Sequence, residues 1–176
     1  PDFIDDSIPL RLDLIRDFFG LRVMGQDRGV EHVLDLVTLI KAGLDNPNKP
    51  SGVLLFVGPT GVGKTELSRA LAELLFGSPS RLLRFDMSEY ASYESYERLI
   101  GTPMREGTLT AAVRRQPFSV VLLDEIEKAH QNVFDLCLGL FDAGRLTDGK
   151  GRTVSFRKTI VVMTSNLGAK VETEAG

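Results

Sequence analysis

Gly58-Pro59-Thr60-Gly61-Val62-Gly63-Lys64-Thr65 is the stretch that decides the fold. It matches G-x-x-x-x-G-K-[ST] and lies between an apolar strand predicted at residues 53–57 and a helix predicted at residues 66–76. Glycines let consecutive backbone amides approach phosphate oxygens closely, and the helix N-terminus adds partial positive charge. The stretch therefore predicts a nucleotide-phosphate site. The alternative is a glycine-rich turn that only resembles the pattern.

Side chains within and beyond this loop suit phosphate chemistry. Lys64 can reach the β- and γ-phosphates of ATP, and the Thr65 hydroxyl can ligate Mg²⁺. Asp124 and Glu125 follow an apolar strand predicted at residues 119–123, and ligands of open α/β sheets bind at the carboxyl ends of strands. We predict that Asp124 holds Mg²⁺ through its waters and that Glu125 takes a proton from the attacking water. A solvated strand end is the alternative reading of the two acids.

Asn166 follows another predicted strand, at residues 159–163. Its amide offers both a donor and an acceptor, so it can bond the γ-phosphate or orient the water. On the residues alone, a turn-forming role before Gly168 is an equally good interpretation. His32 and His130 have no ligand spacing, so the only metal expected is the Mg²⁺ that accompanies ATP.

The order of predicted elements indicates an α/β fold. Residues 1–22 read as a lead-in or linker with helical apolar spacing from residue 10, and an amphipathic helix is predicted at residues 27–44. Helical stretches separate strands long enough to be parallel, so we expect a mostly parallel sheet covered on both faces. Asp148-Gly149 lies in a predicted hairpin. The strands are predicted at residues 53–57, 82–85, 119–123 and 159–163.

Composition excludes several classes of protein. The chain has 176 residues, with 21 Lys and Arg against 24 Asp and Glu, which gives a net charge of −3 and no basic stripe for nucleic acid. A nucleic-acid motor or clamp loader is therefore the least favoured reading. No apolar run could span a membrane. The single cysteine, Cys137, reads as a buried hydrophobe in a cytoplasmic protein. The start, without Met, suggests a piece of a longer protein.

Several further stretches, taken in order, carry a family resemblance: the chain resembles the second ATPase domain of the ClpA/ClpB branch of AAA+ proteins. Lys64 and Thr65 match the Walker A residues of that family, Asp124 and Glu125 its Walker B pair, and Asn166 its sensor 1. The stretches are Val23-Met24-Gly25-Gln26, Gly58 to Leu67, Phe85-Asp86-Met87-Ser88-Glu89-Tyr90, Leu122 to His130, Gly144 to Gly149, Gly151 to Val154 and Thr164-Ser165-Asn166-Leu167-Gly168.

The resemblance implies a three-layer αβα P-loop NTPase, with residues 23–176 as a C-terminally truncated large (nucleotide-binding) subdomain. It implies an ATPase that assembles into homo-hexamers and uses ATP turnover to unfold or disaggregate protein substrates. A protease ring is a partner that the resemblance allows. Val23 and Met24 match the stretch that packs on adenine, and an apolar base pocket is chemically sensible there.

Two departures from the family pattern shape these expectations. Between Gly101 and Gly107 the chain has only Thr102-Pro103-Met104-Arg105-Glu106, without the gripping tyrosine of the family's pore loop. Either the protein lost that loop or the sequence omits it. The alternative function is therefore an ATP-dependent switch or assembly scaffold that threads no polypeptide. The chain also stops before the family's arginine finger, so we expect weak ATP turnover.

Overall fold

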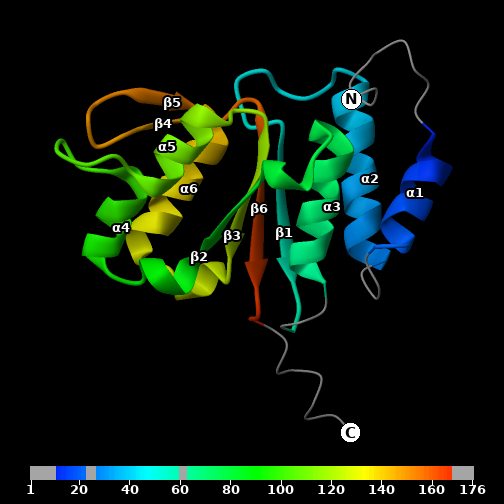
Figure 1. The fold of residues 1–176 in the computed structure, drawn as a ribbon, viewed down its shortest axis with the longest axis horizontal. Helices are drawn as coiled ribbons and strands as arrows, with labels where there is room; N and C mark the ends of the chain where they lie inside the picture. Colours follow the sequence, from blue (N-terminus) through cyan, green and yellow to red (C-terminus); the bar gives the residue numbers. More distant parts are fainter. Residues whose placement is uncertain (1–10, 23–26, 60–62, 168–176) are drawn as a thin grey trace, which may run out of the picture.

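The computed structural model describes residues 11–22, 27–59 and 63–167, which form a sheet between two layers of helices (Figure 1). The helices and strands for which ranges were predicted begin and end close to those ranges. The helices are α1 (Leu12–Gly20), α2 (Asp27–Lys41), α3 (Lys64–Phe76), α4 (Tyr93–Ile100), α5 (Thr108–Arg115) and α6 (Gln131–Ala143), with short 3-10 turns η1 (Pro79–Arg81), η2 (Met87–Tyr90) and η3 (Ile126–Lys128). The strands are β1 (Gly52–Val57), β2 (Leu82–Asp86), β3 (Ser119–Asp124), β4 (Arg145–Thr147), β5 (Thr153–Ser155) and β6 (Thr159–Ser165).

Four strands form the central sheet in the order β1-β6-β3-β2, and every neighbouring pair is parallel. Leu122 of β3 pairs with Val162 of β6, which pairs in turn with Leu54 of β1. The parallel sheet predicted from the sequence is therefore confirmed. β3 and β6 each run further than predicted, to Asp124 and Ser165, which brings polar residues to the carboxyl ends of adjacent strands.

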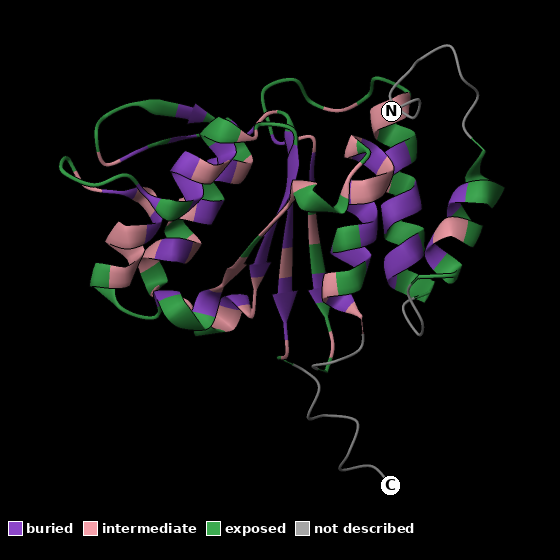
Figure 2. Cartoon of the chain, viewed as in Figure 1, coloured by how far each residue is buried: buried purple, intermediate pink, exposed green. Residues whose placement is uncertain are grey.

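Burial on both faces explains why β3 is apolar at consecutive positions. Val120 and Leu122 belong to a buried cluster with residues of α2 and α3, whereas Val121 and Leu123 belong to a second cluster with residues of α5 and α6. Alternate strand residues point to opposite faces, so both sets must be apolar in a covered strand. The purple strands between buried helix faces in Figure 2 show the three-layer αβα arrangement, as predicted.

The cover is incomplete at β1. Within the described residues β1 pairs only with β6, and its residues Val53, Leu55 and Val57 are 40%, 54% and 59% exposed. They alternate along the strand and so share one face. The other face of β1 contributes Phe56, which is buried against the cluster of α2 and α3.

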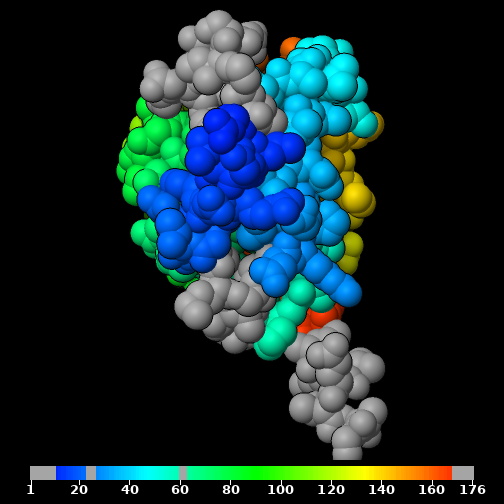
Figure 3. Space-filling view, turned by 90° about the vertical axis from the view of Figure 1, so that its right-hand side faces the viewer, coloured from blue at the N-terminus to red at the C-terminus, as the bar shows by residue number. Residues whose placement is uncertain are grey.

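α1 lies within the segment predicted as a lead-in, and it packs on the outer surface of α2 (Figures 1 and 3). Ile15 and Phe19 are almost fully buried in the same cluster as Val33 of α2. The apolar face predicted from the residue spacing of α1 is therefore the face that packs against α2. The domain division at residue 22 stays a prediction. α2 ends at Lys41 rather than residue 44, because Gly43 adopts a left-handed conformation (φ +64°) that stops the helix.

The predicted hairpin is confirmed, since β4 and β5 pair antiparallel with Leu146 opposite Val154. Its turn is fixed by Asp148, whose side chain is only 3% exposed. Asp148 Oδ2 binds Arg114 Nη2 (2.6 Å) and Arg152 Nε (2.9 Å), and both arginines also bind Glu106. These four charges tie the hairpin to α5 and to the turn before it.

Neutralising Asp148 is expected to destabilise the fold and to flatten its response to acid. Burial opposes ionisation of Asp148, but hydrogen bonds from Arg152, Lys150 and Arg114 outweigh it and lower its pKa to about 2. The ordinary value is 3.8, so this contribution to stability is complete above about pH 4 and is lost as pH falls through about 2. Urea unfolding of Asp148→Asn should give a lower midpoint at pH 7 than the parent, with a smaller further loss in acid.

Asp142→Asn is the matched control, because Asp142 has an 88% exposed side chain and pairs with Lys49 only at 3.4 Å. Exposed pairs contribute little to stability. The control should therefore follow the parent at every pH. Equal acid responses of the parent and Asp148→Asn would contradict the assignment.

Residues 102–105 form a closed turn in place of a long loop. The backbone amides of Thr102 and Arg105 each donate to the other residue's carbonyl oxygen (2.8 and 3.2 Å), and Gly101 bridges to Glu106. Met104 is 93% exposed at the turn. The described turn carries no aromatic side chain.

The structure also places Cys137 and His130. Cys137 is buried in the second cluster, as expected, and burial raises its thiol pKa to about 12. His130 Nδ1 accepts a hydrogen bond from the Asn132 amide and so caps α6. Over residues 11–22, 27–59 and 63–167, no helix has the length and apolarity to cross a bilayer.

Candidate functional site

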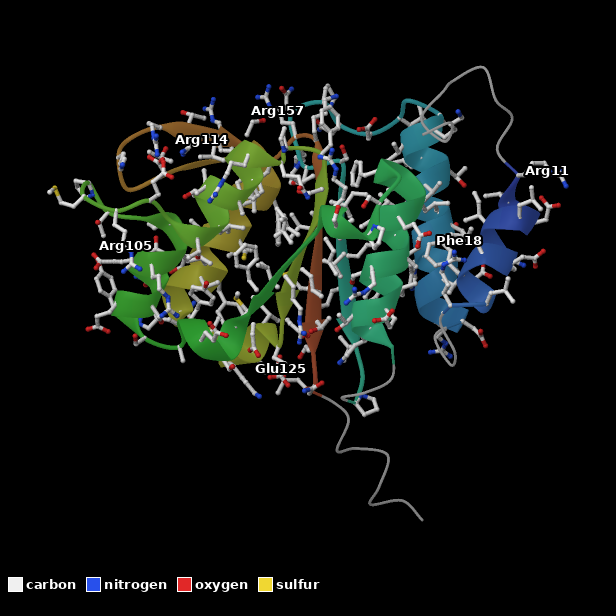
Figure 4. All side chains as sticks on the ribbon, viewed as in Figure 1. Arg11, Phe18, Arg105, Arg114, Glu125 and Arg157 are labelled. Atoms are coloured by element: carbon white, nitrogen blue, oxygen red, sulfur yellow. The ribbon has the colours of Figure 1, made fainter. Side chains whose placement is uncertain are left out.

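The candidate site lies where parallel strands β1, β6, β3 and β2 end, beside the N-terminus of α3. Figure 4 shows Glu125 at this end of the sheet and Arg157 at the opposite end. A cavity of about 410 Å³ opens here. This position agrees with the rule that open α/β sheets bind ligands at the carboxyl ends of their strands. The described lining residues are Gly63, Lys64, Thr65, Glu66, Arg84, Asp86, Asp124, Glu125 and Asn166.

Lys64 is a buried cation at this cavity, and the residue is only 7% exposed. Its Nζ donates to the carbonyl oxygens of Gly58 (2.6 Å) and Ser165 (3.2 Å). It also donates to Oδ1 of Asn166 (2.9 Å). Among the described residues, no carboxylate lies within ion-pairing distance of this ammonium. A buried charge satisfied only by neutral oxygens favours an anionic ligand.

Gly63 connects the loop to α3 in a left-handed conformation, with φ +87°. A residue with a side chain would be strained at this φ, so glycine suits the position. The Leu67 amide closes the first helical hydrogen bond on the Gly63 carbonyl (2.8 Å). The amides that precede it in the first turn have no partner within the helix and lie beside the cavity.

Asp124 is held on both sides by neighbouring strands. Thr164 of β6 donates its hydroxyl to Oδ1 of Asp124, and Arg84 of β2 donates from Nε (3.1 Å) and Nη2 (2.6 Å) to Oδ2. Because β3 lies between β2 and β6, the parallel register itself brings these partners to one carboxylate. The position of Asp124 is therefore fixed before any ligand binds.

Glu125 is the only described non-glycine residue with a positive φ, at φ +56° and ψ +55°. Its backbone amide donates to the Thr164 hydroxyl (2.9 Å), which helps to maintain this conformation. Its carboxylate accepts from Asn166 Nδ2 (2.9 Å) and from Lys128 Nζ. Residues in such uncommon conformations concentrate at functional sites.

The sequence around this site is similar to that of known proteins. The family model described as "AAA domain (Cdc48 subfamily)" matches residues 49–175, about three quarters of the chain. The chain belongs to this AAA family. Curated relatives include "Chaperone protein ClpB" of Staphylococcus epidermidis (strain RP62A), 52% identical over 163 residues, and of Mycobacterium leprae (strain TN), 53% identical over 161 residues. These alignments cover 89% and 88% of this chain but 19% of each relative.

The matches confirm the predicted relationship to Clp-type AAA+ proteins. The chain spans about a fifth of the length of each of these two ClpB relatives. Within this AAA chain, the predicted Walker A, Walker B and sensor 1 residues lie around a single cavity. Their individual roles stay predictions.

The predicted site residues of the AAA chain fall into three groups. Those that line the cavity are Gly63, Lys64, Thr65, Asp124, Glu125 and Asn166. Gly58 contributes its carbonyl oxygen to Lys64, and Pro59 is exposed beside it without lining the described cavity. Val23, Met24, Thr60, Gly61 and Val62 lie outside the described residues, so the adenine pocket and the middle of the loop stay predictions.

Sequence reasoning missed Arg84, Lys128 and Thr164, which hold the two acids. The signal for Arg84 was an arginine among the apolar residues of β2, two residues before Asp86 at that strand's carboxyl end. Thr164 stood in the same polar stretch as Asn166. Lys128 lies one 3-10 turn beyond Glu125, and its hydrogen bond to that carboxylate raises the Lys128 pKa.

Two further acids shape the electrostatics of this AAA site. A hydrogen bond from Ser88 is the main cause of the lowered pKa of Asp86. Asp86 lies opposite Asp124 in the register of β2 and β3. Burial opposes ionisation of Glu127, yet the hydrogen bond from the Asn166 amide helps to lower its pKa. Both carboxylates are therefore charged near neutral pH, which adds negative charge around the cavity.

Two residues at the cavity have oxygen atoms that suit the Mg²⁺ ion that accompanies a nucleotide. Thr65 offers a hydroxyl oxygen and Asp124 a carboxylate oxygen, both of the hard type that Mg²⁺ prefers. Mg²⁺ usually takes only one or two protein ligands at such sites and completes its shell with water and phosphate. Asp124 is the better anchored of the two, since Thr164 and Arg84 fix both its oxygens.

Proposed function

We infer that this chain is the ATP-binding and ATP-hydrolysing module of a Clp-like protein unfoldase or disaggregase. The observation that carries the inference is the buried Lys64 ammonium, whose hydrogen bonds within the described residues go to neutral oxygens, at a cavity lined by Asp124 and Glu125. A cation of this kind attracts a phosphate, and the two acids lie where a metal and an attacking water belong. The similarity to ClpB chaperones supports the same inference.

The residues divide the chemistry among themselves. Lys64 and the first-turn amides of α3 bind the β- and γ-phosphates of ATP. Glu125 accepts the proton of the attacking water, and Asn166 orients that carboxylate through its amide nitrogen, 2.9 Å away. Thr65 and Asp124 would hold Mg²⁺, which neutralises phosphate charge when bound. Thr164 keeps Asp124 and the Glu125 backbone in place.

The wider assembly is part of the same proposal. We propose a cytoplasmic homo-hexamer that acts on protein substrates, because two chaperone relatives share about half of their aligned residues with this chain. A protease ring is a further partner that the family resemblance allows. The relatives favour this reading over a scaffold that threads no polypeptide, although the turn at residues 102–105 has no aromatic residue.

Reactivation of an aggregated protein tests this function. The full-length protein is mixed with heat-aggregated green fluorescent protein and either ATP or ADP, and fluorescence and released phosphate are followed together. We expect fluorescence to recover with ATP only. Phosphate release without recovery of fluorescence would support the scaffold instead. The absence of both phosphate release and recovery would reject the ATPase assignment.

A further inference from the structure

The contact between Arg84 and Asp124 helps to hold this carboxylate in place, but the charge of Arg84 has no role in the chemistry described above. Both guanidinium donors converge on a single carboxylate oxygen, at 3.1 and 2.6 Å. The Asp124 side chain is 13% exposed and that of Arg84 is 53% exposed, so the pair lies at the wall of the cavity rather than in the core. Arg84 can therefore change partners without unfolding its strand.

Phosphate binding beside Asp124 poses an electrostatic problem. The carboxylates of Asp86, Asp124 and Glu125 all line the cavity that must admit a polyphosphate. Glu125 is paired with Lys128, whereas Lys64 binds neutral oxygens and pairs with none of these acids. Among the described residues, Arg84 is the cation paired with Asp124. Without it, Asp124 would repel the phosphates unless a metal ion were present.

We propose that Arg84 is a positioning residue that neutralises Asp124 while no Mg²⁺ is bound, so that the site accepts nucleotide with or without the metal. This inference rests on the proposed nucleotide site. Mg²⁺ and Arg84 then perform the same neutralisation of Asp124, and each matters most when the other is absent. Arg84 therefore determines how strongly the affinity for nucleotide depends on Mg²⁺.

Calorimetric titration with ADP, in Mg²⁺ and in EDTA, tests the proposal on the 176-residue chain. In Arg84→Gln, the Kd for ADP in EDTA should rise roughly tenfold, because a carboxylate near the phosphates is no longer neutralised. The Kd in Mg²⁺ should change less than about threefold, since the metal replaces the lost cation. The ratio of the two Kd values therefore increases. A general loss of structure would weaken both titrations equally and leave the ratio unchanged, which would overturn the proposal.

Two further variants separate the alternatives. Arg157→Gln removes the same charge at the opposite end of the sheet (Figure 4), and its ratio should equal that of the parent. In an Asp124→Asn background, Arg84→Gln should change the Kd in EDTA by less than about twofold, because the charge that Arg84 neutralises is gone. A tenfold loss in that background would mean that Arg84 acts on the phosphates directly or through Asp86 rather than through Asp124, contrary to the proposal. If the parent binds no ADP in either buffer, the proposed nucleotide site fails instead.

Discussion

Glu125→Gln is expected to slow ATP hydrolysis by roughly 10²- to 10⁴-fold while ATP binding is retained, because it removes the group that accepts a proton from the attacking water. Glutamine keeps the size of the side chain and can still accept the hydrogen bond from Asn166. It also removes a negative charge beside the phosphates, so the affinity for ATP should be equal or slightly higher. Phosphate release by the full-length protein measures the rate, and calorimetry measures binding.

Glu94→Gln is the matched control for this prediction, because Glu94 is an exposed acid in the first turn of α4 and is not among the described residues that line the cavity. Its hydrolysis rate should stay within about twofold of the parent rate. Hydrolysis by Glu125→Gln at the parent rate would show that another group takes the proton. Loss of ATP binding in this variant would show that Glu125 has a structural role.

The sheet was readable from the sequence because its strands obey a simple physical rule. A strand covered on both faces must be apolar at consecutive positions, and residues 120–123 satisfy this condition. The packing of α1 was not readable, although its helical spacing was. Spacing shows that a helix has an apolar face, but only the tertiary structure shows that Ile15 and Phe19 meet α2.

The site was predictable to the extent that its residues belong to a contiguous motif or to the end of a strand. Lys64, Asp124 and Asn166 come from three separate segments, and the carboxyl ends of adjacent parallel strands bring them together. The partners of Asp124 depend instead on the strand order, which places β3 between β2 and β6. Because sequence periodicity does not determine strand order, Arg84 could not be assigned to Asp124 in advance.

Close approach and charge pairing hold residues 101–107 in the observed turn. The turn is short, and Glu106 beside it joins the ion pairs of Arg114 and Arg152. The hairpin of β4 and β5 packs closely against this turn, since a Cβ at Gly149 would lie 2.1 Å from the Gly101 carbonyl oxygen. A glycine at position 149 therefore suits this close contact as well as the hairpin turn that Asp148 and Gly149 form. The Asp-Gly motif predicted the hairpin, but only the structure shows that the hairpin packs against residues 101–107.

Lys64→Ala is expected to weaken ATP binding by roughly 10- to 150-fold, since a charge-assisted hydrogen bond to phosphate contributes about 1.5–3 kcal/mol. The loss should be seen for ADP as well, because the lysine reaches the β- as well as the γ-phosphate. Thermal unfolding without nucleotide separately measures the effect on the fold, because Lys64 also donates to the carbonyl oxygens of Gly58 and Ser165. Calorimetric titration of the 176-residue chain with each nucleotide measures the effect.

Lys158→Ala provides the matched control, because Lys158 is exposed beside Arg157 at the far end of the sheet from the cavity. Both substitutions remove one positive charge, so a general electrostatic effect on a polyanion would weaken both variants alike. Only a local contact predicts that Lys64→Ala loses affinity while Lys158→Ala keeps the parent value. Equal affinities of Lys64→Ala and the parent would exclude phosphate binding by this lysine, and the assignment of the loop would fail with it.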